Sequence, residues 1–254
     1  MPTPVAPFNK YVKHGAYHYN ATLGTKSIRD FDIRLSARYE TAVRLLGPTS
    51  GDRVLDAGSG EGVASILCCR RGASVVALEM EAEACQLGQE IARQEGFSDD
   101  SLRFMQHDLY KLPYPDKTFD GIISLEVIEH MSDVHAYLRE LRRVLKLGGK
   151  IVISTPHKRM DGILQDEYHV TEFDGPELAR TLAEFFHNVQ ILSGWSVRLQ
   201  GFYEKNWPSV LLGKTKRSLF RFAALRGFNL FAGGCVYSPK CPLIYSVGRA
   251  DIKK

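Results

Sequence analysis

The sequence predicts an α/β fold, in which a seven-stranded, mostly parallel sheet has helices on both faces and a small cap. Seven short apolar runs, beginning at residue 53, have the composition of buried strands. Most of the intervals between them show the 3.6-residue periodicity of amphipathic helices. A glycine-rich turn follows the first run directly. Because parallel strands need long crossover connections, this alternation favours a parallel sheet.

The predicted elements account for most of the chain as one domain. The strands are expected at residues 53–57, 74–79, 102–108, 121–126, 150–155, 188–195 and 241–250. Helices are expected at residues 34–46 and 175–186, and from a cap at Ser132 to a stop at Gly148 and Gly149. We expect residues 1–35 to form a cap segment on a main domain of residues 36–254, which has an aromatic, basic insertion at about 196–239.

The charge is distributed unevenly along a chain of otherwise ordinary globular composition. Hydrophobic residues make up 44% and charged residues 24% of the 254 residues, which leaves little room for extensive disorder. Residues 201–254 have a net charge of +8 within a total of +4, so residues 1–200 carry −4. Such a basic end can meet phosphate, an anionic membrane surface or an acidic substrate, or be a solvated face without a partner.

Within this basic part, residues 214–226 place Lys and Arg around apolar side chains. The stretch is compatible with a peripheral helix on a membrane surface and with a cap helix packed on its own domain. The five cysteines are an odd number without CxxC spacing, which favours a reducing compartment. No signal-peptide run opens the sequence, and no apolar stretch of about 18 residues occurs. We therefore expect a cytoplasmic protein.

The most specific motif is Val54-Leu55-Asp56-Ala57-Gly58-Ser59-Gly60-Glu61-Gly62, between the first expected strand and a helix. Gly58 and Gly60 allow a ligand to approach the backbone closely. The third glycine comes one residue too early for a dinucleotide GxGxxG loop, and no Gly-Lys-Ser/Thr follows as in a P-loop. A carboxylate at Asp56 repels phosphate and favours an ammonium group. The loop therefore predicts a nucleoside ligand with a cationic amino acid part.

Two further acids follow the next two strands. Glu79 ends the second strand, where a carboxylate can accept hydrogen bonds from ribose hydroxyls. Asp108 ends the third, where it can accept a hydrogen bond from the exocyclic amine of adenine. The carboxyl ends of parallel strands meet at one edge of a sheet. We therefore expect Asp56, Glu79 and Asp108 to lie along one groove that fits an amine, a ribose and an adenine.

From residue 36 to residue 156 the chain resembles the class I S-adenosylmethionine-dependent methyltransferases, which have a Rossmann-like fold. The glycine loop, Glu79, Asp108, the run LPYPDKTFD and a Leu-Gly-Gly turn follow one another in the order of that family. The motifs are most similar to those of the ubiquinone-biosynthesis O-methyltransferases. The resemblance implies S-adenosylmethionine as the cofactor, with the glycine loop on its methionine part.

The resemblance also assigns contacts to other positions. Met80 and Leu109 would flank the adenine ring, Arg38 would bind the methionine carboxylate, and Glu126 would pack near the cofactor. The complete cofactor-binding set that we expect is Arg38, Asp56, Gly58, Gly60, Glu79, Met80, Asp108, Leu109 and Glu126.

A second motif follows the fourth strand. In a helical turn, Glu126, Glu129 and His130 would share one face, and His169 could supply a fourth ligand. This set can hold Mg²⁺, Mn²⁺, Fe²⁺ or Zn²⁺, and the carboxylates favour Mg²⁺ or Mn²⁺. The turn is similar to the metal-binding ExxEH turn of the ubiquinone-biosynthesis O-methyltransferases and small-RNA 2′-O-methyltransferases. Three interpretations stay open: a metal site, catalysis by His130 and His169 without metal, and a structural role.

The leading hypothesis is O-methylation of a small-molecule hydroxyl, because a hydroxyl must lose a proton and a histidine or a metal can assist. The alternatives are ribose 2′-O-methylation of RNA, N-methylation of a small metabolite, and a binding protein without turnover. Nucleic acid is disfavoured as a partner, because residues 1–200 are net acidic and contain no recognisable RNA-binding module. Tyr17, His18 and Tyr19 are candidates for a lid over the acceptor.

Overall fold

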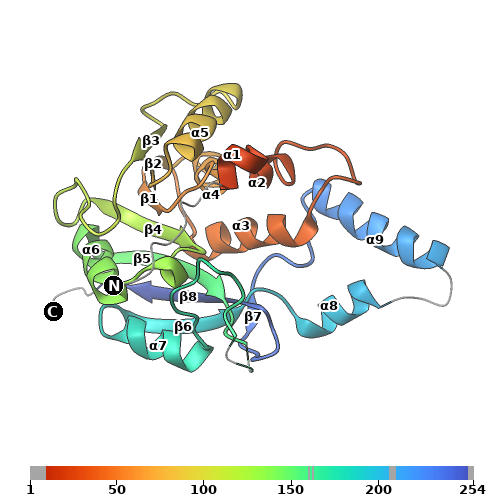
Figure 1. The fold of residues 1–254 in the computed structure, drawn as a ribbon. Helices are drawn as coiled ribbons and strands as arrows, with labels where there is room; N and C mark the ends of the chain where they lie inside the picture. The colour runs from red at the N-terminus through yellow and green to blue at the C-terminus, as the bar shows by residue number, and fades with distance from the viewer. Residues whose placement is uncertain (1–9, 160, 162, 206–209, 251–254) are drawn as a thin grey trace.

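The computed structural model describes residues 10–159, 161, 163–205 and 210–250 (Figure 1). In this part of the chain, one sheet contains eight strands in the order β3-β2-β1-β4-β5-β8-β6-β7. Their bounds are β1 (Arg53–Ala57), β2 (Ser74–Glu79), β3 (Leu102–Gln106), β4 (Phe119–Leu125), β5 (Leu145–Pro156), β6 (His187–Ser193), β7 (Cys235–Val236) and β8 (Leu243–Arg249).

The strand directions confirm the predicted mixed but mostly parallel sheet. Strands β1 to β5 pair in parallel, whereas β8 lies antiparallel between β5 and β6. Seven of the eight strands correspond to the predicted ones. The additional strand, β7, pairs with the end of β6. It has only two residues, too few to produce a recognisable alternation in the sequence.

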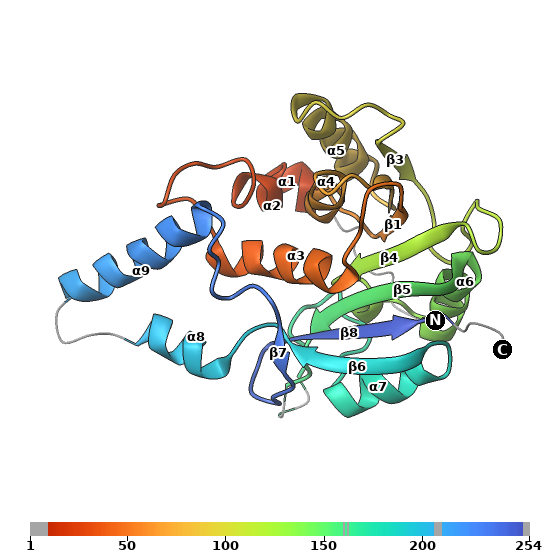
Figure 2. The ribbon, with the colours of Figure 1, turned by 180° about the vertical axis from the view of Figure 1, so that it is seen from behind.

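Helices cover both faces of the sheet, as predicted (Figures 1 and 2). Residues from α3, α4 and α5 form one core with one face of the strands, and residues from α6 and α7 form a second core on the other face. Strand β2 shows the alternation, because Val75 and Ala77 belong to the first core and Val76 and Leu78 to the second. These helices are α3 (Ile33–Leu46), α4 (Val63–Cys69), α5 (Ala82–Gln94), α6 (Val134–Val144) and α7 (Gly175–Ala183).

The predicted limits of α6 were wrong at both ends. The carboxylate of Asp133, not the hydroxyl of Ser132, caps the helix by accepting a hydrogen bond from the Ala136 amide. The helix ends at Val144, before the predicted glycine stop, because the chain enters β5 directly at Leu145. Helix α7 is also shorter than predicted and ends at Ala183.

Residues 196–239 contain more regular structure than the sequence predicted. Helices α8 (Val197–Glu204) and α9 (Val210–Leu225) project together beyond the sheet (Figures 1 and 2), and we call residues 197–230 the arm. Phe220 of α9 packs against Tyr203 of α8 and against Phe231, which holds the arm to the core cluster of α3. Of the helices in the described ranges, none is both long and apolar enough to cross a membrane.

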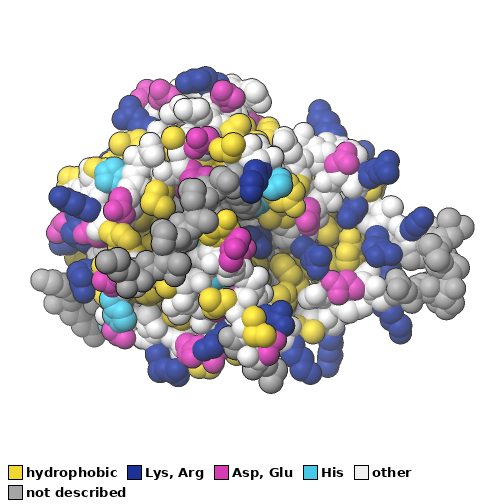
Figure 3. Space-filling view, in the orientation of Figure 1, with side chains coloured by type: hydrophobic (Ala, Val, Ile, Leu, Met, Phe, Trp, Pro, Cys, Tyr) yellow, Lys and Arg dark blue, Asp and Glu magenta, His cyan; other side chains and the backbone are white. Residues whose placement is uncertain are grey.

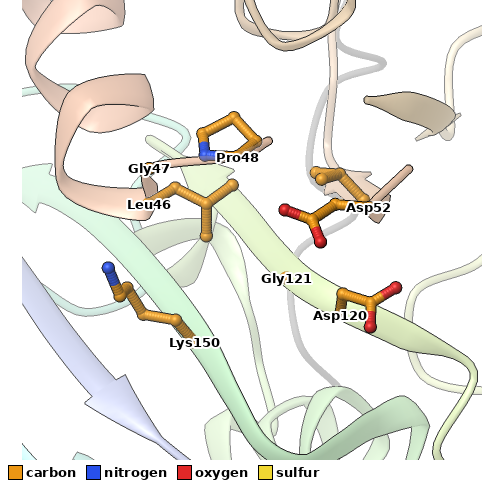
Figure 4. A pocket seen from close by; sticks show the side chains of 8 residues that line it. Leu46, Gly47, Pro48, Asp52, Asp120, Gly121 and Lys150 are labelled. Carbon is orange, nitrogen blue, oxygen red and sulfur yellow. The ribbon is translucent and has the colours of Figure 1, made fainter. Parts of the chain in front are cut away.

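The amino ends of the central strands form a small cavity (Figure 4). It has a volume of about 60 Å³, and Asp120 of β4 and Lys150 of β5 contribute to its lining. The ammonium of Lys150 donates a hydrogen bond to the Leu45 carbonyl, 3.0 Å away. This volume is far below that of ordinary ligand sites.

Candidate functional site

The glycine loop connects β1 to α4 and is shaped by left-handed backbone at Gly58, Gly60 and Gly62. At Gly58, a Cβ atom would overlap the Val127 side chain, which comes from the segment after β4. At Gly60, it would overlap the Tyr11 hydroxyl. The positive φ angles favour glycine at all three positions, and at Gly58 the Val127 side chain also leaves no room for a Cβ atom.

Asp56 lies beneath this loop and not on the expected groove. Its side chain is 1% exposed, and it accepts a hydrogen bond of 2.6 Å from the Ser65 hydroxyl on α4. Burial raises the pKa of Asp56 to about 7. The three acids therefore do not line one groove, because Asp56 is enclosed between the strand and the helix.

The raised pKa of Asp56 makes the stability depend on pH. The folded protein favours the protonated carboxyl, so this contribution is complete below the unfolded pKa of 3.8 and is lost as the pH rises through about 7. We expect the free energy of unfolding to fall by about 3 kcal/mol more in the wild type than in Asp56→Asn between pH 4 and pH 7.5. Urea titrations across this range measure it.

The control for this experiment is Asp108→Asn, which changes an exposed carboxyl. Glu129 stays present in both variants and contributes equally to them. Parallel stability curves for the wild type and Asp56→Asn would contradict the burial of a protonated Asp56.

Glu79 and Asp108 occupy the expected strand ends. The Glu79 carboxylate accepts hydrogen bonds from the amides of Gly60, at 2.9 Å, and Met80, at 2.7 Å, and so joins the end of β2 to the glycine loop. Asp108 is exposed beyond β3 and accepts a hydrogen bond from the Tyr110 amide. Met80 is 68% exposed and Leu109 is buried. The structure thus places these four side chains at the carboxyl edge of β2 and β3.

Arg38 and Glu126 form a pair near the carboxyl end of β4. The Arg38 guanidinium lies 3.4 Å from the Glu126 carboxylate, which also accepts a hydrogen bond from Ser154. The buried Nε of Arg38 has no hydrogen-bond partner among the described residues. Glu126 has a φ of 57°, a left-handed conformation that costs energy for a non-glycine residue. Together, the strain and the unsatisfied donor mark a place where an anionic group would fit.

Three of the four predicted metal ligands converge. Each of Glu129, His130 and His169 offers a ligand atom within 4.8 Å of the others. Glu126 is not part of this group, because the helical turn starts only at Ile128 and Glu126 turns toward Arg38 instead. The predicted four-ligand set is therefore reduced to three among the residues that the structure describes.

Glu129 is the most constrained member of this triad, the name we use for Glu129, His130 and His169. Its side chain is fully buried, and one carboxylate oxygen accepts a hydrogen bond of 2.9 Å from the Thr155 hydroxyl. The other oxygen, Oε1, has no partner in the described part of the chain. Burial, followed by the charge of Glu126, raises the pKa of Glu129. A cation or a proton at this oxygen would satisfy it.

Hydrogen bonds outside the triad orient its two histidine rings. The His130 and His169 rings meet edge to face, with 5.1 Å between their centroids. His130 Nδ1 is hydrogen-bonded to the Tyr168 carbonyl, and His169 Nδ1 lies 2.6 Å from the carboxylate of buried Glu172. Glu172 was not among the predicted site residues, although it follows His169 by three residues. A carboxylate behind a histidine is a common support for a ligand or base.

The N-terminal segment closes over the glycine loop. Helices α1 (Lys10–His14) and α2 (Tyr17–Asn20) bring the backbone amides of His18 and Tyr19 to the buried carboxylate of Glu61, and the His18 ring approaches it to 3.2 Å. Burial raises the pKa of Glu61, but the hydrogen bonds to the carboxylate and the charge of His18 together have the larger effect. The net result is a lowered pKa. The predicted lid thus contacts the loop, and sequence reasoning missed Glu61 and Tyr11.

Residues 55–153 match the family model described as a methyltransferase domain. The chain contains a class I methyltransferase domain. A demethylmenaquinone methyltransferase of Tropheryma whipplei is 33% identical over 112 residues, which cover 44% of this chain and 45% of that protein. A probable S-adenosylmethionine-dependent methyltransferase of Mycobacterium tuberculosis is 30% identical over 169 residues, 63% of this chain and 59% of that protein. The chain thus spans about half the length of these curated relatives.

The fold of the methyltransferase domain also appears among solved structures. The geranyl diphosphate C-methyltransferase of Streptomyces coelicolor, solved with Mg²⁺, geranyl diphosphate and S-adenosyl-L-homocysteine, has a TM-score of 0.59 and 19% identity. The similarity covers 84% of this chain and 78% of that one. The glycine loop, Glu79 and two members of the triad, Glu129 and His130, lie within the region that the family model matches. His169 lies beyond it.

Proposed function

We propose that this protein transfers the methyl group of S-adenosylmethionine to a hydroxyl of a small molecule. The observation that supports a hydroxyl acceptor is the triad, which lies beyond the carboxyl ends of β4 and β5. Sulfonium methyl transfer needs little more than positioning and the exclusion of water. A hydroxyl acceptor also has to lose a proton, and a buried carboxylate beside two histidines can assist that loss.

The residues around the loop fit the cofactor that the family implies. The peptide groups of Gly58 and Gly60 would contact its methionine part, and Arg38 has an unsatisfied donor for a carboxylate. Glu79 would accept a ribose hydroxyl at Oε2, which accepts only the Gly60 amide and keeps a lone pair, whereas Oε1 already accepts the amides of Met80 and Glu81. The exposed carboxylate of Asp108 would accept a hydrogen bond from the exocyclic amine of adenine. When bound, the cofactor supplies an activated methyl group on sulfur.

The same triad fits a divalent metal such as Mg²⁺. Glu129, His130 and His169 would hold it, and the unpartnered Oε1 of Glu129 is the oxygen that a cation would satisfy. A metal there would acidify an acceptor hydroxyl. Glu172 would keep the His169 ring in place through its contact with Nδ1. Without metal, a histidine of the triad would itself accept the proton.

Methyl transfer to defined acceptors tests the proposal. Purified protein is incubated with S-adenosylmethionine labelled in the methyl group, with and without Mg²⁺, and with phenols, sugars, amines and RNA as separate acceptors. We expect label on hydroxyl compounds, and more of it with Mg²⁺ than with a chelator. Transfer to amines alone, or cofactor binding with no transfer to any acceptor, would overturn the O-methyltransferase assignment.

A further inference from the structure

The arm exposes large apolar side chains that the fold does not use. Leu219 is 64% exposed and Phe228 is 74% exposed, and three more large apolar residues of the arm are also exposed to solvent: Phe202, Phe222 and Leu230. A soluble monomer seldom groups so many exposed apolar side chains in one short segment. The opposite side of α9 faces the body of the protein, because Phe220 and Ala224 pack against the core.

Positive charge surrounds these apolar residues. Residues 196–239 contain seven Lys or Arg and a single acid, Glu204. Leu219 and Phe222 lie three residues apart on the outer face of α9, and the guanidinium of Arg226, directly after the helix, lies 5.0 Å from the centre of the Phe222 ring. Lys214 and Arg217 are exposed on other sides of the same helix, so positive charge also flanks this face. Figure 3 shows Lys and Arg side chains gathered over the projecting arm with hydrophobic side chains between them.

The arm is tied to the body by contacts that leave this outer face unobstructed. The Arg221 guanidinium donates hydrogen bonds to the carbonyls of Ile28 and Arg29. Asn229 donates one to the Ile33 carbonyl at the start of α3, and Arg34 pairs with Glu204 at 2.8 Å. The outer face is therefore held in a fixed relation to the methyltransferase domain.

We propose that the outer face of the arm binds the surface of an anionic lipid membrane. Exposed leucine and phenylalanine side chains can enter the boundary between headgroups and acyl chains, while Lys and Arg remain among anionic headgroups. The exposed phenylalanine rings could also stack on the bases of single-stranded RNA, but Leu219 and Leu230 add aliphatic surface that suits acyl chains better than bases. This inference goes beyond the proposed methyl transfer, since it assigns a location to the enzyme and not a reaction.

Vesicle sedimentation tests the proposal with the full-length protein. Vesicles of phosphatidylcholine alone are compared with vesicles containing about one third phosphatidylserine, at low and high salt. We expect the protein to bind the anionic vesicles at least tenfold more tightly than the neutral ones, and less tightly at high salt. Equal binding to both, or no binding to either, would overturn the proposal.

Variants separate the two components of the surface. Leu219→Ser with Phe222→Ser removes apolar contact, and Lys214→Glu with Arg217→Glu reverses charge; each pair should weaken binding at least tenfold. The matched control, Arg93→Glu with Arg103→Glu, changes the net charge equally on exposed residues of α5 and β3 and should bind like the wild type.

Circular dichroism confirms that each variant folds, and methyl transfer is measured separately, so a failure of the proposed reaction does not affect this result. Equal loss in the control, binding unaffected by the serine variants, or a single-stranded RNA that displaces the protein from vesicles and binds more tightly would reject a lipid surface.

Discussion

Replacing Glu79 with alanine is expected to weaken the binding of S-adenosylmethionine about 100-fold. The carboxylate connects β2 to the amide of Gly60 and would also accept the ribose hydroxyls. Hydrogen bonds to a charged group contribute about 1.5 to 3 kcal/mol each, so losing this acceptor should cost about 3 kcal/mol of binding free energy. Isothermal titration calorimetry with S-adenosylmethionine and with S-adenosylhomocysteine measures the loss.

Two variants control this experiment. Glu83→Ala removes an exposed acid in the first turn of α5, four residues further along, and should bind like the wild type. Glu79→Gln keeps the shape but not the charge and should bind with intermediate affinity. An affinity of Glu79→Ala equal to that of Glu83→Ala would contradict the placement of the cofactor across β1 and β2.

Replacing His169 with alanine is expected to lower kcat by about 100- to 1,000-fold and to leave the affinity for S-adenosylmethionine unchanged. Positioned proton transfer contributes factors of this size, and His169 belongs to the acceptor side of the site. Glu129→Gln should produce a similar loss, because it replaces one of the carboxyl oxygens that would hold a metal or accept a proton with an amide nitrogen that can do neither. Initial rates with a hydroxyl acceptor, together with cofactor calorimetry, separate the two effects.

A metal readout distinguishes a catalytic from a structural role for these residues. If the triad holds a divalent ion, Mn²⁺ should bind to the wild type and fail to bind to either variant in calorimetry. His187→Ala, an exposed histidine of β6, is the matched control and should retain both activity and metal binding. Full activity of His169→Ala with an intact fold would assign the triad a structural role.

The sequence predicted those features that depend on neighbouring residues. The strands, the glycine loop and the strand-end positions of Glu79 and Asp108 follow from local periodicity and spacing, and the structure confirms their arrangement. It did not predict the burial of Asp56, because a pattern that places a residue at a strand end does not say that Ser65 of the next helix covers it.

The contacts that the sequence missed join distant segments. His18 and Glu61 are 43 residues apart, and the lid contact between them has no periodicity to reveal it. Glu126 has a left-handed backbone and contacts Arg38 and Ser154 from distant segments, so the spacing of the ExxEH motif alone did not reveal that it lies outside the triad. Helix α9 was ambiguous because its pattern suits both a cap helix and a membrane-facing one.

The contacts of Tyr11 and His18 with the glycine loop bear on how the proposed cofactor would enter and leave its site. If the cofactor lies against Gly60 as proposed, its release would require α1 and α2 to move, and that movement would remove the two backbone amides that donate hydrogen bonds to Glu61. Such a movement would leave a buried carboxylate without two of its donors, which carries an energetic cost. We therefore expect cofactor release to be slow compared with the methyl transfer itself.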